Sequence, residues 1–325
     1  MGALIIIYKH CLISNNTNNL FQIPEKKKPF VCHFHSHYLP ATSNSHTLTT
    51  THTNKHFMAA TTANLDQSPG IEPVKVVIQN NSGEKLVGLL HDTGSKEVVI
   101  LCHGFTGTKE YSMKVELAVA LEIQGISAFR FDFSGNGESE GTFEFGNYRK
   151  EVDDLRAVTQ YFTASGRVVN AILGHSKGGN VVVLYASLHH DILTVVNVSG
   201  RYKMDRGIGE RLGKDYLERA KKDGFIDIKS KTGKVLFRAT VESIMERLNT
   251  NMHEAGLRIN KDCRVLTVHG SADEVIPVED ALEFAKIIPN HDLRIIEGAN
   301  HGYDKHRDEL VSTVLAFIKD NLPKV

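Results

Sequence analysis

The chain has 325 residues, of which 41% are apolar and 23% charged, and its 38 basic side chains balance 38 acidic ones. This composition is typical of a globular protein, and it excludes a largely disordered chain or a surface built to bind nucleic acid or an anionic membrane. The length allows one large α/β domain or two small domains. The four cysteines are widely spaced and form no C-x-x-C pair, so we expect reduced intracellular thiols without a disulfide framework or a zinc module.

Residues 1–65 differ from the rest of the chain. They contain five lysines, no arginine, one acid (Glu25) and seven of the 17 histidines. No apolar period is sustained, so we expect a disordered extension. Two explanations stay open: a transit peptide of the plastid type, or translation that starts at Met58 and leaves the protein cytoplasmic. The apolar run at residues 2–8 is too short to span a bilayer, so no stable membrane insertion is expected.

Short runs rich in β-branched residues recur after the extension and predict eight strands. They are Val74–Ile78, Leu86–Leu90, Val98–Cys102, Ser127–Asp132, Val169–Leu173, Leu193–Val198, Val265–Val268 and Leu293–Ile296. A turn signal at residues 80–83 separates the first two, which predicts a hairpin. The later strands alternate with predicted helices at Ser112–Ile123, Tyr148–Ala164, Gly178–His189, Val278–Ile287 and His306–Asn321. This alternation predicts an α/β fold with a mostly parallel, doubly wound sheet, in a domain that covers residues 70–325.

One long segment, between Val198 and Val265, interrupts the alternation and has no strand signal. The apolar residues from Val241 to Met252 recur at helical spacing, and Lys214–Lys222 reads as a second helix that ends at Gly224. A helical insertion after a parallel strand is well placed to cover the ligand crevice. We therefore expect a helical cap at about residues 201–258.

The segment Gly174-His175-Ser176-Lys177-Gly178 matches the pattern G-x-S-x-G. An apolar run leads into it and a buried helix leads out, which is the strand, sharp turn and helix of a nucleophile elbow. Glycines at positions 174 and 178 avoid Cβ clashes in so tight a turn. Ser176 is therefore the predicted nucleophile.

A serine nucleophile needs a base to take its proton and an acid to orient that base. Asp273 follows the strand at Val265–Val268, and His301 follows the strand at Leu293–Ile296, in the order expected for this architecture. Glu274, Glu279 and Asp280 are alternatives to Asp273. His269, His291 and His306 are alternatives to His301, and we expect His269 to be packed or hydrogen-bonded near the site instead of catalytic.

The oxyanion of a tetrahedral intermediate needs backbone donors. The residue after the nucleophile, Lys177, supplies one N–H, and Phe105 in the glycine-containing loop at residues 103–107 supplies the other. The Lys177 side chain has two interpretations: it attracts an anionic substrate, or it pairs with a nearby carboxylate. The second is favoured, although residues 201–256 lean basic, with 13 lysines and arginines against 9 acids.

Taken together, the HGF, FDFSGNGESEG, GHSKGG, HGSAD and ANHG motifs resemble the α/β-hydrolase superfamily over about Val74 to Leu322. Within it the chain is similar to small serine esterases, acylglycerol-lipase-like enzymes and bacterial cinnamoyl or feruloyl esterases. The resemblance implies a triad of Ser176, Asp273 and His301, oxyanion donors at Phe105 and Lys177, and no cofactor. It also implies that the loop at residues 132–139 supports the site, although relatives usually carry arginine where Ser134 stands.

The residues and the resemblance predict a serine hydrolase that cleaves small-molecule carboxylic esters through an acyl-enzyme. A slow-turnover ligand receptor of the same fold stays open, as does a lyase or acyltransferase that reuses the triad. No metal cluster is evident beyond a weak histidine run at residues 33–37, and Cys102 and Cys263 read as buried small hydrophobes. Neither the physiological ester nor the oligomeric state follows from the sequence.

Overall fold

The computed structural model describes residues 71–322. All of the described residues belong to one compact unit. The expectations for the extension, the Met58 start and the histidine run therefore lie outside the described residues. Within the described residues, no helix is both long and apolar enough to cross a membrane.

An eight-stranded sheet forms the centre of the described unit, and all eight predicted strands are present. The strands are β1 (Val74–Gln79), β2 (Lys85–His91), β3 (Glu97–Cys102), β4 (Ser127–Phe131), β5 (Val168–His175), β6 (Thr194–Val198), β9 (Arg264–Gly270) and β10 (His291–Ile296). Their order is β1-β2-β4-β3-β5-β6-β9-β10. The β1–β2 and β2–β4 pairs are antiparallel and the other neighbours are parallel, so the mostly parallel sheet is confirmed.

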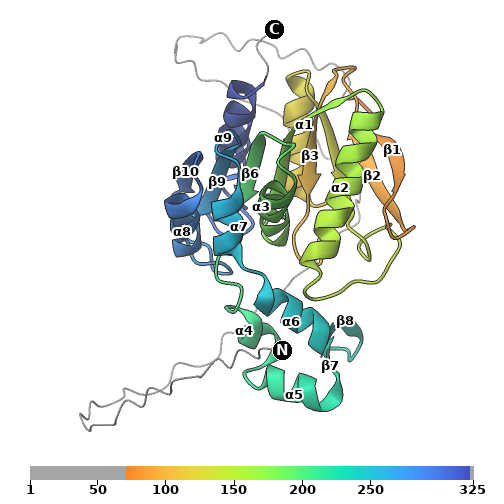
Figure 1. The fold of residues 1–325 in the computed structure, drawn as a ribbon, viewed down its shortest axis with the longest axis vertical. Helices are drawn as coiled ribbons and strands as arrows, with labels where there is room; N and C mark the ends of the chain where they lie inside the picture. Colours follow the sequence, from red (N-terminus) through yellow and green to blue (C-terminus); the bar gives the residue numbers. More distant parts are fainter. Residues whose placement is uncertain (1–70, 323–325) are drawn as a thin grey trace, which may run out of the picture. The chain divides into compact units, whose positions relative to one another are not determined.

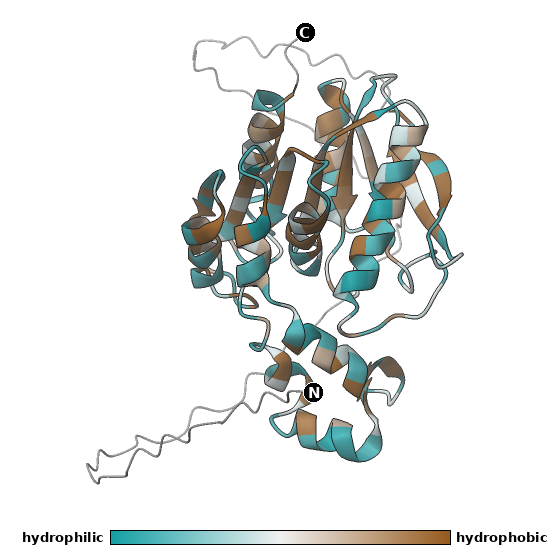
Figure 2. Cartoon of the chain, in the orientation of Figure 1, coloured by the Kyte–Doolittle hydropathy of each residue, from teal (hydrophilic) through white to brown (hydrophobic). Residues whose placement is uncertain are grey.

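The central strands are apolar on both sides because helices cover both faces of the sheet. Along β3, Val98 and Ile100 belong to one buried cluster, whereas Val99 and Leu101 belong to the cluster on the opposite face. This alternation is the two-residue period of a strand, and burial on both faces explains the unbroken apolar run. Figure 2 shows the central strands mostly in the hydrophobic colour.

Six helices form the two layers around the sheet, and a seventh, α6, connects the cap to them. They are α1 (Ser112–Ile123), α2 (Tyr148–Ala164), α3 (Lys177–His189), α6 (Val241–Asn249), α7 (Met252–Arg258), α8 (Glu279–Ile287) and α9 (Arg307–Asp320). Helices α1 and α9 pack on one face of the sheet, and α2, α3, α7 and α8 pack on the other (Figure 1). The five helices predicted between the strands are all present within one residue of their expected bounds.

The predicted cap is present after β6, but it is not wholly helical. It contains α4 (Ile208–Leu212), α5 (Tyr216–Asp223) and α6, together with an antiparallel hairpin of β7 (Phe225–Lys229) and β8 (Val235–Thr240) (Figure 1). The expectation of no strand in this segment was wrong. The hairpin has little core-facing pattern: only Ile226 and Ala239 are buried, whereas the apolar residues Phe225, Val235 and Leu236 are exposed.

The apolar stripe from Val241 to Met252 belongs to two helices, where the sequence predicted one. Helix α6 ends at Asn249, and the side chain of Asn251 then caps α7 by accepting a hydrogen bond from Glu254 N–H at 3.1 Å. An asparagine that competes for the backbone in this way favours a new helix start. Helix α7 packs against α3 and α8, so this end of the insertion lies in the helical layer of the main domain.

Candidate active site

Ser176 lies at the turn between β5 and α3, in a backbone conformation that few residues other than glycine adopt. Its φ and ψ are 56° and −118°. A Cβ on Gly174 would lie 2.0 Å from Gly178 O, and one on Gly178 would lie 2.5 Å from His103 O. Both glycines are therefore required by close backbone approach, as the sequence predicted. The turn holds Ser176 at the carboxyl edge of the sheet in a strained conformation of the kind found at functional sites.

Asp273 follows β9, and four donors surround its buried carboxylate. Oδ1 accepts the N–H groups of Val275 at 2.9 Å and Ile276 at 2.8 Å. Oδ2 lies 2.7 Å from His301 Nδ1 and 3.3 Å from His269 Nε2. Burial alone would raise the pKa of this carboxyl, but the hydrogen bonds from His269 and His301 hold it well below its usual range. Asp273 is therefore an ionised acceptor.

His301 follows β10, and its backbone and ring are both fixed. Its N–H donates to Glu274 Oε2 at 3.2 Å, and its Nδ1–H donates to Asp273. This tautomer leaves Nε2 as an acceptor. Within residues 71–322, Ser176 Oγ makes no hydrogen bond to that nitrogen, and catalytic hydrogen bonds of this kind are often long until a substrate binds.

The alternative residues are engaged elsewhere. His269 is completely buried and donates Nε2–H to Ile276 O at 2.9 Å, in agreement with the expected packing role. His291 Nε2 lies 2.8 Å from Thr267 Oγ1, and His306 immediately precedes α9. Among the acids, Glu279 is in the first turn of α8, and Asp280 Oδ2 accepts the N–H of Tyr202 at 2.9 Å. Of the candidate acids, only Asp273 has its carboxylate on the ring of His301.

His175 is a site residue that the sequence pattern did not identify. Its Nε2–H donates to the backbone carbonyl of His301 at 2.9 Å, and the two ring centroids are 4.8 Å apart. Burial and the neighbouring His301 ring hold the pKa of His175 well below its usual value, so it is a neutral, single-tautomer support. The variable position of G-x-S-x-G gave no signal for this contact, because the contact joins the end of β5 to a loop 126 residues later in the chain.

The two predicted oxyanion donors border the same small cavity as Ser176. Phe105 lies in the loop after β3, and Lys177 is the first residue of α3. Neither backbone N–H donates to another group within the described part of the chain. A free N–H after the serine and at a helix N-terminus is suited to an anion. The loop itself is tightened by a hydrogen bond from Gly107 N–H to Gly104 O at 3.0 Å.

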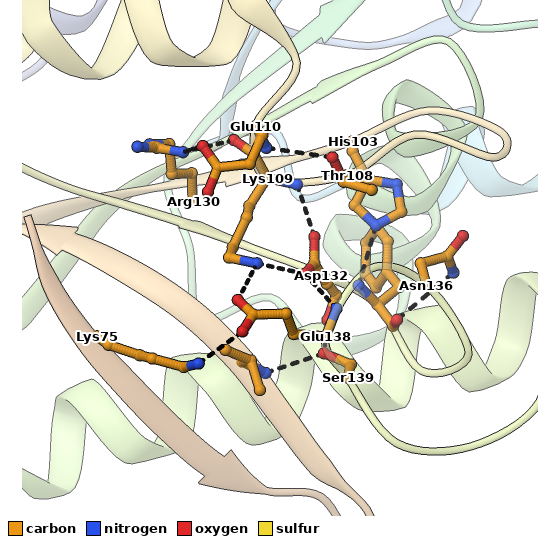
Figure 3. A network of polar contacts seen from close by, with 12 residues as sticks. Lys75, His103, Thr108, Lys109, Glu110, Arg130, Asp132, Asn136, Glu138 and Ser139 are labelled. Atoms are coloured by element: carbon orange, nitrogen blue, oxygen red, sulfur yellow. Dashed lines mark hydrogen bonds and ion pairs between the residues drawn. The ribbon is translucent and has the colours of Figure 1, made fainter.

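A buried polar network holds this loop against the loop that follows β4 (Figure 3). His103 donates Nδ1–H to Gly104 O at 2.8 Å and accepts the Phe133 N–H on Nε2 at 3.0 Å. Burial lowers the pKa of His103 to about 3, so this neutral tautomer persists. Asp132 accepts the Lys109 N–H at 2.6 Å and pairs with Lys109 Nζ at 2.7 Å. The loop at residues 132–139 therefore does contact the oxyanion loop.

Ser134 takes no part in that contact. Its N–H and hydroxyl donate to Asp154 at 2.8 and 2.9 Å, and the hydroxyl also lies 2.9 Å from Glu84. The side chain that relatives usually replace by arginine thus anchors the loop to α2. Support for the oxyanion loop comes from Asp132, Lys109 and His103.

The Lys177 side chain turns away from solvent and pairs with a carboxylate, as the favoured interpretation stated. Its Nζ lies 2.6 Å from Glu151 Oε1, and both side chains are 4% exposed. The ammonium also lies 5.1 Å from the centroid of the Tyr148 ring, within cation–π range. Burial raises the pKa of Glu151 to about 7, although Lys177 opposes the rise, and Glu151 Oε2 has no hydrogen-bond partner within residues 71–322.

Two cavities lie near α2 and α3. A small one of about 40 Å³ is bordered by Ser176 and by residues of the cap, whereas a groove of about 580 Å³ runs along α2, α3 and α7. Tyr148 lines both cavities. Of these two cavities, only the small one is lined by the predicted nucleophile, so we place the candidate active site there and not in the larger groove.

The strand order, the strained serine after β5 and the acid–histidine pair after β9 and β10 define a protein of the α/β-hydrolase fold. Residues 93–217 match the family model described as serine aminopeptidase, S33. The resemblance of the sequence to α/β hydrolases is therefore confirmed. That match includes Ser176 but ends before Asp273 and His301.

Known proteins with similar sequence or structure include enzymes named as esterases. Protein phosphatase methylesterase 1 of Candida albicans is 28% identical over 117 residues, which are 35% of this chain. The match spans only about a third (32%) of the length of that curated relative. Est1E of Butyrivibrio proteoclasticus, solved with ferulic acid bound, is 24% identical over 77% of this chain and 100% of its own, with a TM-score of 0.63. The Pyrococcus furiosus esterase Pf2001 is 21% identical over 77% of this chain and 90% of its own, with a TM-score of 0.59.

Proposed function

We propose that this chain is a serine hydrolase that cleaves carboxylic esters through an acyl-enzyme. The observation that carries the proposal is the hydrogen bond of 2.7 Å between Asp273 and His301, at the same sheet edge as the strained Ser176. The esterases among the similar structures favour esters as the substrate class.

In this mechanism Ser176 Oγ attacks the ester carbonyl while His301 Nε2 takes its proton. Asp273 holds the imidazole in the required tautomer and stabilises the imidazolium that forms. The N–H groups of Phe105 and Lys177 donate to the oxyanion of the tetrahedral intermediate. His301 then protonates the leaving alcohol, and a water molecule activated by the same imidazole releases the acid.

Reaction with an alkyl fluorophosphonate tests the nucleophile directly. We expect one covalent adduct at Ser176, detected by mass spectrometry, and none in Ser176→Ala. Ser199 is the internal control and should carry no adduct. It also follows a strand and has a positive φ of 51°, but its Oγ lies 2.8 Å from Tyr303 Oη. Equal labelling of wild type and Ser176→Ala would contradict the assignment.

A set of matched esters and amides with the same acyl group then tests the reaction class. Faster hydrolysis of the esters, lost in Ser176→Ala, is the expected result. Peptide hydrolysis is the second candidate, because the matching family model is described as a serine aminopeptidase. Preference for aminoacyl amides would favour that candidate. Labelling by the phosphonate without multiple turnover of any ester would favour a receptor role.

A further inference from the structure

Three arginine side chains from the cap converge on the small cavity beside Ser176. Arg201, Arg211 and Arg247 all line it, together with Phe105 and the serine. Arg201 and Arg247 are buried, with 8% and 6% of their surface exposed. Buried guanidinium groups normally pair with carboxylates, because an uncompensated buried charge is unfavourable.

None of these three guanidinium groups forms an ion pair with a carboxylate in residues 71–322. Arg247 donates Nε–H and Nη2–H to the carbonyls of Met204 and Arg206, at 3.0 and 2.6 Å. Arg201 donates Nη2–H to Val275 O at 2.7 Å. These neutral acceptors fix the directions of the two groups without cancelling their charge.

The nearest acids are engaged by other donors. Asp273 accepts hydrogen bonds from His269 and His301, and Asp280 accepts the N–H groups of Tyr202 and Lys203. Lys177 also borders the cavity, but its ammonium is paired with Glu151. The positive charge of the cavity therefore comes from the three arginines.

Arg211 contacts the side chain of Phe105 at the edge of the same cavity. Its guanidinium carbon lies 4.3 Å from the centroid of the Phe105 ring, and Phe105 carries one of the proposed oxyanion donors. Burial and the neighbouring Arg247 lower the pKa of Arg201, as expected for like charges held together without a counter-ion, whereas Arg211 is exposed at the mouth of the cavity. A cavity of about 40 Å³ has room for only a few water-sized groups, so the matching anion is compact.

We propose that Arg201, Arg211 and Arg247 form a subsite for a carboxylate that the ester substrate carries near its scissile bond. This inference rests on the proposed esterase function and specifies its substrate class: half-esters of small dicarboxylic acids, or esters of small hydroxy acids. Arginine presents paired N–H donors that match a carboxylate.

Matched acid and amide substrates test the subsite. Monomethyl succinate and methyl succinamate place the charge on the acyl side, and acetoxyacetate and acetoxyacetamide place it on the alcohol side. We expect kcat/KM for at least one acid to exceed that of its neutral amide by tenfold or more. Arg211→Gln should reduce this ratio at least fivefold. Arg211 is exposed and donates no hydrogen bond within the described residues, so this variant should fold normally.

Arg206→Gln is the matched control, because it removes the same charge from an exposed cap residue that does not line the cavity. It should leave the acid-to-amide ratio unchanged. Equal ratios in wild type and Arg211→Gln, or no preference for either acid, would overturn the subsite while hydrolysis of the neutral esters still supported the esterase function.

Calorimetry with Ser176→Ala separates binding from catalysis. The same two acids should bind this variant at least tenfold more tightly than their amides, and Arg211→Gln in the same background should remove the difference. This binding result would support the subsite even if the wild-type protein hydrolysed no ester. A lack of ester hydrolysis would count only against the proposed function. Tighter binding of inorganic phosphate than of either acid would overturn the assignment to carboxylates.

Discussion

His175 and His301 contact each other through both ring and backbone. The Nε2–H of His175 donates to His301 O at 2.9 Å, and the ring centroids are 4.8 Å apart. The residue before the proposed nucleophile therefore holds the loop of the proposed base, which ties the end of β5 to the loop after β10. Because His175 is buried and neutral, it positions His301 without adding a charge.

Replacing His175 by phenylalanine keeps a ring beside His301 but removes the hydrogen bond to its carbonyl. One such bond contributes about 1 kcal/mol, so we expect kcat to fall roughly fivefold with KM nearly unchanged. Steady-state kinetics on a neutral ester measure both constants. A change confined to KM would show that His175 shapes the binding cavity and does not position the base.

Asp273→Asn should lower kcat by about 10⁴-fold, because an amide no longer selects the tautomer of His301 that leaves Nε2 free to accept a proton. Glu274→Gln is the matched control. The amide oxygen of glutamine still accepts the His301 N–H, which Glu274 now binds at 3.2 Å, so its kcat should stay within about threefold of wild type. Equal losses in the two variants would remove Asp273 from its proposed role.

The sequence predicted the sheet well because its strands are buried on both faces. Every residue of β4 and β6 is buried, and the apolar and β-branched residues that predominate in them mark the strands. The β7–β8 hairpin was missed because an exposed two-stranded ribbon needs no continuous apolar face. The break between α6 and α7 depends on local capping by Asn251, which the apolar period alone does not reveal.

Within the site, the sequence identified the residues that a sharp backbone turn or the expected order along the chain marks out. Ser176 stood out because the glycines at 174 and 178 are imposed by steric contacts of 2.0 and 2.5 Å. The arginine cluster gave no such signal, because Arg201, Arg211 and Arg247 meet only when the cap folds over the sheet edge. The composition showed that the cap has more basic than acidic residues, but not that three of its arginines line the cavity at Ser176.

The buried ion pair of Lys177 and Glu151 predicts an asymmetric response to mutation. Glu151→Gln leaves the Lys177 ammonium buried without a counter-charge, and we expect the free energy of unfolding to fall by about 3 kcal/mol. Combining it with Lys177→Met should recover most of this loss, because no buried charge remains. Urea denaturation of the two single variants and the double variant measures the coupling. Additive losses would show that the two side chains do not stabilise each other.

His291 predicts a loss of stability in mild acid. Burial lowers its pKa to about 4, against about 6.5 for an unfolded chain. Between these values the unfolded state binds a proton that the folded state does not, so stability falls as the pH decreases from about 6.5 to about 4. In His291→Gln, which can still accept from Thr267, the fall in Tm from pH 7 to pH 5 should be smaller.

His253→Gln is the matched control for this pH effect, because His253 is exposed. Its Tm should fall with acid as much as that of wild type. An unchanged fall in His291→Gln would show that the acid sensitivity comes from other buried groups, such as His103, whose pKa burial lowers to about 3, and His175, whose pKa burial holds well below its usual value.

Tyr148 lines both the cavity at Ser176 and the larger groove along α2, α3 and α7, and it is only 4% exposed. Tyr148→Ala should join the two spaces and admit longer acyl chains. We expect the ratio of kcat/KM for octanoyl over acetyl esters to rise at least tenfold, with a stability loss of about 3–5 kcal/mol from the deleted ring.

Tyr148→Phe keeps the ring and should leave the ratio unchanged. Leu188→Ala, which alters only the groove, should do the same, because the wall beside Ser176 stays intact. An unchanged ratio in Tyr148→Ala would mean that the acyl chain leaves Ser176 toward the cap and not toward the groove.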